Sequence, residues 1–134
     1  MRVFLDTNVV LDTILDRVGG EASSLVIAKC LDGHLIVVSW HSVATMHYLI
    51  EKQTGTTNAR NCIQDLLVWS EVATVGKAEA VHALSLPMKD YEDAMQVVSA
   101  ESAACDVIVT RDTRDFKNSP ITAVSPEEFL RTFA

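Results

Sequence analysis

Five short apolar runs, separated by longer segments, constrain the fold of this chain more than any other feature of its sequence. The runs are Val3–Leu5, Leu35–Val38, Val72–Val75, Val107–Thr110 and Ile121–Val124. Short runs that are apolar throughout are typical of strands buried on both faces, and their alternation with helices is typical of a parallel sheet. We therefore expect an α/β protein with a five-stranded parallel sheet covered by helices on both faces, that is, a three-layer α/β/α sandwich.

The segments between the runs are long enough for helices. Residues 39–71 hold two predicted helices with a break near Gly55, and residues 76–106 hold two more with a break at Pro87. No repeat, linker or low-complexity tract interrupts residues 1–134. We therefore expect a single domain, long enough to fold without disulfides or a structural metal.

Two of the predicted helices begin at clear capping residues. Asp90 stands where a side-chain oxygen would cap the helix that leads into the fourth strand. Ser125 is followed by Pro126 and Glu128, which together predict a C-terminal helix that runs through Phe133.

The charge balance excludes a protein that wraps duplex nucleic acid along its whole surface. The chain has 18 acidic and 11 basic residues and a net charge of −7, whereas such proteins are basic. Contact with nucleic acid must then be local or assisted by cations. The apolar runs are far shorter than the ~20 residues that cross a bilayer, and Asp6 follows too early for a signal peptide. We expect a cytoplasmic protein that begins at Met1 and has no membrane partner.

The three cysteines are Cys30, Cys62 and Cys105, each beside apolar neighbours. An odd number without C-x-x-C spacing argues against a disulfide framework and against a zinc site. We expect reduced thiols that pack in the core.

Aspartates cluster at the ends of the predicted strands. Asp6 directly follows the first strand, and Asp112 and Asp115 follow the fourth. Asp93 lies in the first turn of the helix that leads into the fourth strand. Because open parallel sheets bind ligands beyond the carboxyl ends of their strands, Asp6, Asp93 and Asp112 meet there if these strands are neighbours.

Gathered carboxylates point to a bound cation. Two of them about 4 Å apart repel by roughly 1–4 kcal/mol, a cost that a cation relieves. A set of oxygen ligands favours Mg²⁺ or Mn²⁺, which can acidify water and stabilise a phosphoryl group under attack. Each aspartate also has a structural explanation as a helix cap or a loop residue, but one shared ion explains them together. We predict phosphodiester hydrolysis.

Three segments of the chain resemble the motifs of PIN domains. Phe4–Asp12 resembles the opening motif, Asp90–Ala94 the third acidic motif and Val109–Phe116 the fourth. The likeness spans essentially the whole chain, and it is strongest to small prokaryotic members such as the VapC-like toxins of toxin–antitoxin pairs. It implies a Mg²⁺- or Mn²⁺-dependent endoribonuclease, a sheet of order 3-2-1-4-5, an RNA substrate, an antitoxin partner and a homodimer.

The resemblance also implies roles for individual residues. Asp6, Asp93 and Asp112 match the catalytic acids that bind the metal, and Asp115 matches a frequent additional acid. The polar residues expected to support the site are Asn8, Thr110, Asp90 and Thr45.

Thr45 marks a departure from the family pattern. PIN domains usually carry a glutamate on the helix after the second strand, six residues beyond a serine such as Ser39, and that position is Thr45 here. Glu51 lies on a different face of the helix, and His41, one turn before Thr45, is more typical of a structural residue. The alternative is therefore a catalytically weakened module that binds RNA or protein without turnover.

Arg111, Arg114 and Lys117 surround the fourth motif. They are candidates for binding RNA phosphates beside the metal. The alternative is a solvated loop in which their charges balance Asp112 and Asp115.

The two helices after the second strand are unusually apolar, and most of their large side chains should lie in the core, with some left for a homodimer or antitoxin interface.

Other folds that gather acidic residues fit this sequence poorly. A response-regulator receiver needs an aspartate after the third strand, where this chain has Gly76-Lys77-Ala78, and a haloacid-dehalogenase-type phosphatase needs one at Asn8.

Overall fold

The computed structural model describes residues 1–134 and places β1 at the centre of a five-stranded parallel sheet. The order is β3-β2-β1-β4-β5, and every pair is parallel, as expected. The strands are β1 (Arg2–Leu5), β2 (Leu35–Ser39), β3 (Glu71–Ala73), β4 (Val107–Val109) and β5 (Ala123–Val124).

Seven α-helices and one 3₁₀ helix connect and cover the strands. The predicted breaks are confirmed, since Gly55 separates two helices with φ of +89°, a conformation that favours glycine, and Pro87 lies between two others. The helices are α1 (Thr7–Ile14), α2 (Glu21–Leu31), α3 (Trp40–Thr54), α4 (Thr56–Trp69), α5 (Lys77–Ser85), α6 (Tyr91–Ser102), η1 (Thr113–Phe116) and α7 (Pro126–Thr132).

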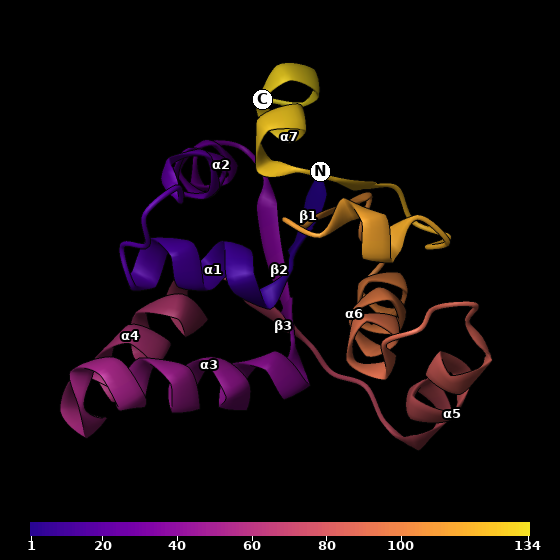
Figure 1. The fold of residues 1–134 in the computed structure, drawn as a ribbon, viewed down its shortest axis with the longest axis horizontal. Coiled ribbons are helices and arrows are strands. Elements are labelled where there is room, and N and C mark those ends of the chain that lie inside the picture. Colours follow the sequence, from indigo (N-terminus) through magenta and orange to yellow (C-terminus); the bar gives the residue numbers. More distant parts are fainter.

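The helices form the two outer layers of an α/β/α sandwich (Figure 1). Alternate strand residues point to opposite faces. Val3 and Leu5 belong to the core under α1, α2, α3, α4 and α7. Phe4 belongs to the core under α6, and α5 packs on the outside of α6. The three-layer prediction is confirmed.

β3 and β5 are shorter than the apolar runs that predicted them, whereas β1 and β2 are each one residue longer. β2 stops at Ser39, whose side chain caps α3, so the predicted strand Val72–Val75 loses its partner after Ala73. β5 is an edge strand, and only Ala123 and Val124 of the predicted run pair with β4.

The capping predictions are confirmed. The Asp90 side chain accepts a hydrogen bond from the backbone N–H of Asp93 at the start of α6, and the Ser125 hydroxyl accepts one from Glu128 at the start of α7. α7 ends at Thr132, with Phe133 as its C-cap.

The cysteines are free thiols. Cys30 and Cys105 are buried, and Cys62 is half-buried. Burial raises the pKa of Cys30 and of Cys105 to about 11, so both stay protonated at neutral pH. None of the helices combines the length and the apolar composition that crossing a bilayer requires.

The helices α3 and α4 bury only part of their apolar surface. Met46, Ile50 and Leu66 are fully buried. In contrast, four large apolar side chains of this pair are exposed, namely Trp40, Tyr48, Leu67 and Val68. The predicted interface on these helices stays a prediction.

Candidate active site

The carboxyl ends of β1 and β4 meet at the point where the strand order reverses. From β1 the chain passes to β2 and β3 on one side, and it then crosses to β4 and β5 on the other. Leu5 pairs with Val109, and the Asp6 backbone N–H donates to the Val109 carbonyl at 3.0 Å. The residues that follow the two strands, Asp6 and Thr110, therefore lie side by side.

Asp6 is the most buried acid of the site. Its side chain caps α1, with Oδ1 accepting from the Thr7 backbone N–H at 2.8 Å, while Oδ2 accepts from the Thr110 hydroxyl at 2.8 Å. Only 5% of the residue is exposed. Burial is the main cause that raises the pKa of Asp6 to about 6, and repulsion from Glu92 and Asp112 adds to it.

Thr110 links the acids of the two strands. It is fully buried, and its hydroxyl donates to Asp6 while accepting the backbone N–H of Asp112 at 3.0 Å. One hydroxyl thus fixes the Asp6 carboxylate and the backbone from which the exposed Asp112 side chain starts.

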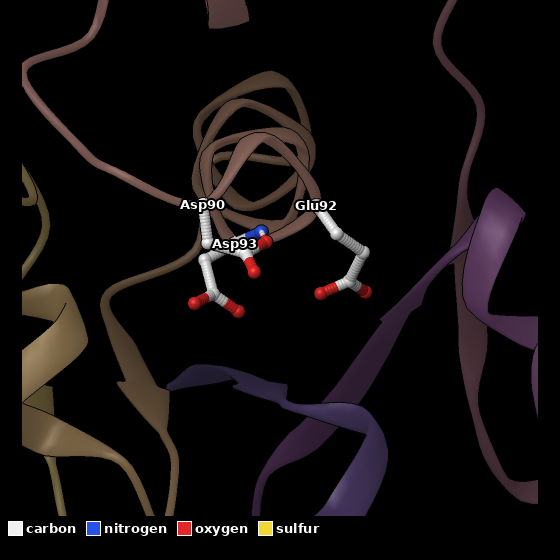
Figure 2. A group of neighbouring side chains, drawn as sticks. All are labelled: Asp90, Glu92 and Asp93. Carbon is white, nitrogen blue, oxygen red and sulfur yellow. Dashed lines mark hydrogen bonds between the residues drawn. The ribbon is translucent and has the colours of Figure 1, made fainter.

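The first turn of α6 contributes three more acids (Figure 2). Asp90, Glu92 and Asp93 project to one side of the helix, each with an oxygen within 4.8 Å of the others. Burial is the main cause that raises the pKa of Asp93 to about 7, followed by repulsion from Asp90, Asp6 and Glu92. This repulsion indicates that α6 and β1 bring their carboxylates to one place.

A buried network of polar groups lies behind these acids. Gln96 is fully buried, and its Nε2 is 3.0 Å from the Thr7 hydroxyl, 2.8 Å from the Ser42 hydroxyl and 2.8 Å from the Glu92 carboxylate. Thr7 donates to Ser42, which hydrogen bonds to Ser39. The network ties α1, α3 and α6 together next to Glu92, with Ser39 at the end of β2.

The donor set fits a hard divalent cation. The groups that face one another are carboxylates, and Gln96 Oε1 is a buried acceptor without a hydrogen-bond partner. Burial and repulsion between carboxylates raise the pKa values of Asp6 and Asp93, so their ionised forms are disfavoured in a way that a cation would relieve. Oxygen ligands of this kind suit Mg²⁺ or Mn²⁺.

The other residues expected to support the site lie at its margin or away from it. Asn8 is exposed, and its Oδ1 accepts from Arg17 at 3.1 Å. Thr45 is exposed, and its hydroxyl donates to the His41 carbonyl at 3.4 Å. Asp115 is exposed in η1 and makes no ion pair. The structure thus places Asp6 within electrostatic range of both Asp93 and Asp112, with Thr110 between Asp6 and Asp112, while the acids whose oxygens lie within 4.8 Å of one another are Asp90, Glu92 and Asp93. Asn8 faces Arg17 instead.

The basic residues of the fourth motif differ in what they contact. Arg111 pairs with Asp12 of α1 at 2.7 Å, and Asp12 is 1% exposed. The idea that Arg111 only balances Asp112 and Asp115 is therefore wrong. Arg114 and Lys117 are exposed and make no ion pair.

We expect Arg111→Ala to lower the free energy of unfolding by about 2 kcal/mol, because it leaves the buried Asp12 carboxylate with the Ser23 hydroxyl at 2.7 Å and the more distant Arg17 at 3.8 Å. Arg114→Ala removes the same charge from the same loop and serves as the control, with an expected change below about 0.5 kcal/mol. Urea unfolding curves measure both. Equal stability of the two variants would contradict the assignment.

Sequence reasoning missed Glu92, Gln96 and Asp12. Glu92 stands next to Asp93, and adjacent helix residues do not normally face the same way, so nothing in the pattern singled it out. Gln96 lies one helical turn after Glu92, a spacing that allows their hydrogen bond. Asp12 lies within the opening motif, but its partner Arg111 is 99 residues away.

Solved structures show the same fold. A chain of VapBC2 from Rickettsia felis, bound to a promoter DNA fragment, has a TM-score of 0.74 and 15% identity, over 93% of this chain and 98% of that one. DNA-bound VapBC from Salmonella typhimurium has a TM-score of 0.73 and 20% identity, over 94% of this chain and 98% of that one. The sarcin-ricin loop cleaving toxin VapC20 from Mycobacterium tuberculosis has a TM-score of 0.65 and 15% identity, over 91% of this chain and 98% of that one.

At these identities the likeness shows the fold alone. No match was found among curated proteins. The PIN domain family model matches residues 2–114, which include Asp6, Asp93 and Asp112. The chain therefore belongs to the PIN domain family.

Proposed function

We propose that this protein is an endoribonuclease that hydrolyses RNA phosphodiester bonds with Mg²⁺ or Mn²⁺ held by Asp6, Asp93 and Asp112. The observation that carries the proposal is the convergence of these acids at the switch point of the sheet, where Asp6 is buried and repelled by other carboxylates. Asp115, on the exposed 3₁₀ turn after Asp112, is proposed as an additional acid at the outer side of the site.

The protein's own groups hold the site in shape before any substrate binds. The Thr7 backbone N–H and the Thr110 hydroxyl fix the two oxygens of Asp6, and Asp90 caps the turn that carries Asp93. When bound among these acids, a divalent cation supplies an oriented, acidified water and offsets the charge that develops on the phosphoryl group. Pre-set carboxylates need no rearrangement during the reaction, which lowers its barrier.

RNA as the substrate is supported by the charges around the site. Arg114 and Lys117 are exposed and unpaired beside Asp112, while the net charge of −7 disfavours contact elsewhere. The VapC20 neighbour is described as a toxin that cleaves the sarcin-ricin loop. A cytoplasmic location follows from the proposal of an RNA substrate.

An antitoxin partner and a homodimer are part of the same proposal. The neighbours from Rickettsia and Salmonella are complexes of VapB with VapC, and another is a toxin–antitoxin complex from Klebsiella pneumoniae. The exposed apolar side chains of α3 and α4, such as Trp40 and Val68, give such a partner apolar surface to cover.

The test is cleavage of single-stranded and structured RNA by purified protein with Mn²⁺ or Mg²⁺. We expect cleavage that stops on chelation with EDTA and returns when the metal is restored. RNA that stays intact at high protein and Mn²⁺ concentrations would overturn the proposal of catalysis.

We expect Arg114→Ala/Lys117→Ala to weaken RNA binding and to leave the turnover rate on saturating RNA unchanged, because the two side chains lie outside the acidic cluster. Losing two phosphate contacts lowers the slope of log affinity against log salt by about 1.4. Arg60→Ala/Lys29→Ala removes the same charges elsewhere on the exposed surface and is the control. Equal salt slopes for the two double variants would exclude this contact.

A second candidate function is favoured by Thr45, since α3 offers no acid at the position where PIN domains usually carry one. In that case the protein binds RNA or a protein partner without turnover. RNA binding that persists with every divalent metal while no cleavage occurs would support this alternative.

A further inference from the structure

The structure places a carboxylate opposite the position on α3 that lacks one. Thr45 and His41 are one helical turn apart and share a face of α3. His41 Nε2 lies 3.2 Å from Oε1 of Glu92. Glu92 therefore reaches from α6 toward the face of α3 where the family pattern puts a glutamate.

Glu92 is held in this position by buried groups. Its Oε1 accepts from Gln96 Nε2 at 2.8 Å, and Gln96 is fixed in turn by Thr7 and Ser42. The carboxylate can only accept, so the amide nitrogen of Gln96 must be the atom that faces it. Both of these hydrogen bonds use Oε1 of Glu92.

The Glu92 carboxylate lies beside a proposed metal ligand. It has an oxygen within 4.8 Å of oxygens of both Asp90 and Asp93. Figure 2 shows its carboxylate pointing to the same side of α6 as those of Asp90 and Asp93. Glu92 thus adds negative charge next to Asp93, although its side chain is 52% exposed.

Gln96 is a second unusual group beside these acids. Its residue is fully buried, and its Oε1 has no hydrogen-bond partner, whereas three acceptors lie within 3.0 Å of Nε2. A buried carbonyl oxygen without a donor is costly. The side chain keeps this orientation with its Nε2 toward Glu92, so that it holds the Glu92 carboxylate.

We propose that Glu92 supplies the metal-facing carboxylate that α3 lacks at Thr45, with His41 and Gln96 as the residues that position it. This inference depends on the proposed function, because it adds a ligand to the same cation site. It also gives the site a fourth carboxylate beside Asp6, Asp93 and Asp112, so that the absence of an acid on α3 need not abolish metal binding.

The test is the Mn²⁺ dissociation constant of the whole protein, measured by isothermal titration calorimetry and by loss of the free Mn²⁺ spectrum in electron paramagnetic resonance. We expect Glu92→Gln to raise the Mn²⁺ dissociation constant by ~10-fold or more, because the loss of a metal ligand, or of a residue that directly supports one, has an effect of this size. Each variant is first shown to unfold cooperatively in EDTA, so that a misfolded protein is not scored as a weak binder.

Two controls separate ligation from general charge. Glu101→Gln makes the same change in the same helix, at a glutamate that also pairs with a histidine, and should leave Mn²⁺ affinity unchanged. Asp90→Asn removes a charge next to the site, but asparagine can still cap α6. We therefore expect Mn²⁺ affinity to fall by only about threefold, from the loss of electrostatic attraction. A Glu92→Gln effect no larger than that of Asp90→Asn overturns the inference.

A double variant tests whether the two positions serve one site. Thr45→Glu in the Glu92→Gln background should restore Mn²⁺ affinity to within about threefold of wild type. A double variant that binds as weakly as Glu92→Gln overturns the claim that Glu92 stands in for α3. Failure of the proposed function gives a different result, because the wild-type protein itself then binds no Mn²⁺. That result would overturn both the metal-dependent function and the role of Glu92.

Discussion

Asp6→Asn is expected to lower the rate of RNA hydrolysis by about 10³-fold, the scale of loss when a group that stabilises transition-state charge is removed. The fold should survive. Asparagine is as good an N-cap as aspartate, and its Oδ1 can still accept from the Thr7 backbone N–H. The change therefore removes a buried charge without removing the cap of α1.

The measurement is the initial rate of cleavage at saturating Mn²⁺ and RNA. Asp65→Asn makes the same substitution on the exposed surface of α4 and should keep the wild-type rate. An Asp6→Asn protein that retains more than about a tenth of the wild-type rate would exclude Asp6 as a catalytic metal ligand.

The same variant should be more stable than wild type when metal is removed, and the gain should depend on pH. The pKa of Asp6 is raised to about 6 in the folded protein, above its usual value of 3.8, so the folded state keeps a proton that the unfolded state loses. Stability from this group is fully present below pH 3.8 and is lost as the pH rises to about 6. At pH 7 the loss amounts to about 3 kcal/mol.

Asp93 works in the same direction, because its pKa is raised to about 7, and Glu92 works in the opposite one, because hydrogen bonds from His41 and Gln96 lower its pKa. The difference in unfolding free energy between Asp6→Asn and wild type reports the Asp6 charge together with its repulsion of Asp93. In EDTA we expect the difference in unfolding free energy to be near zero at pH 4, and we expect the variant to be more stable by about 3 kcal/mol at pH 7.

Denaturant unfolding at a series of pH values in EDTA measures this difference. Mn²⁺ at 100 times its dissociation constant should then stabilise wild type by about 2.7 kcal/mol at pH 7 and the variant by much less. If the difference in unfolding free energy between the variant and wild type stays constant from pH 4 to pH 7, the pKa of Asp6 is not raised in the folded protein.

Much of the fold was predictable because buried strands can be recognised from short stretches of sequence. The strands β1, β2 and β4 are buried on both faces of the sheet, so they consist almost entirely of apolar residues and stand out as apolar runs. Asp6 and Asp112 were predictable for a related reason, since residues that end neighbouring parallel strands must share one edge. The order of the strands came from the resemblance to PIN domains and is confirmed.

The contacts that set the details of the site were not predictable. The Arg111–Asp12 pair joins residues far apart in the chain, and no local pattern indicates it. Glu92 faces the site because Gln96 and His41 hold it there, and His41 comes from a different helix. Asn8 follows Asp6 by only two residues, yet it turns to Arg17 because α1 begins at Thr7 and carries it away from the carboxylates.

The central claim is that Asp6, Asp93 and Asp112 share one divalent cation. Anomalous diffraction from crystals soaked in Mn²⁺ tests it most directly. We predict a peak bonded to oxygens of all three aspartates at about 2.0–2.3 Å. Well-ordered side chains with no anomalous peak among them at saturating Mn²⁺ would contradict the claim.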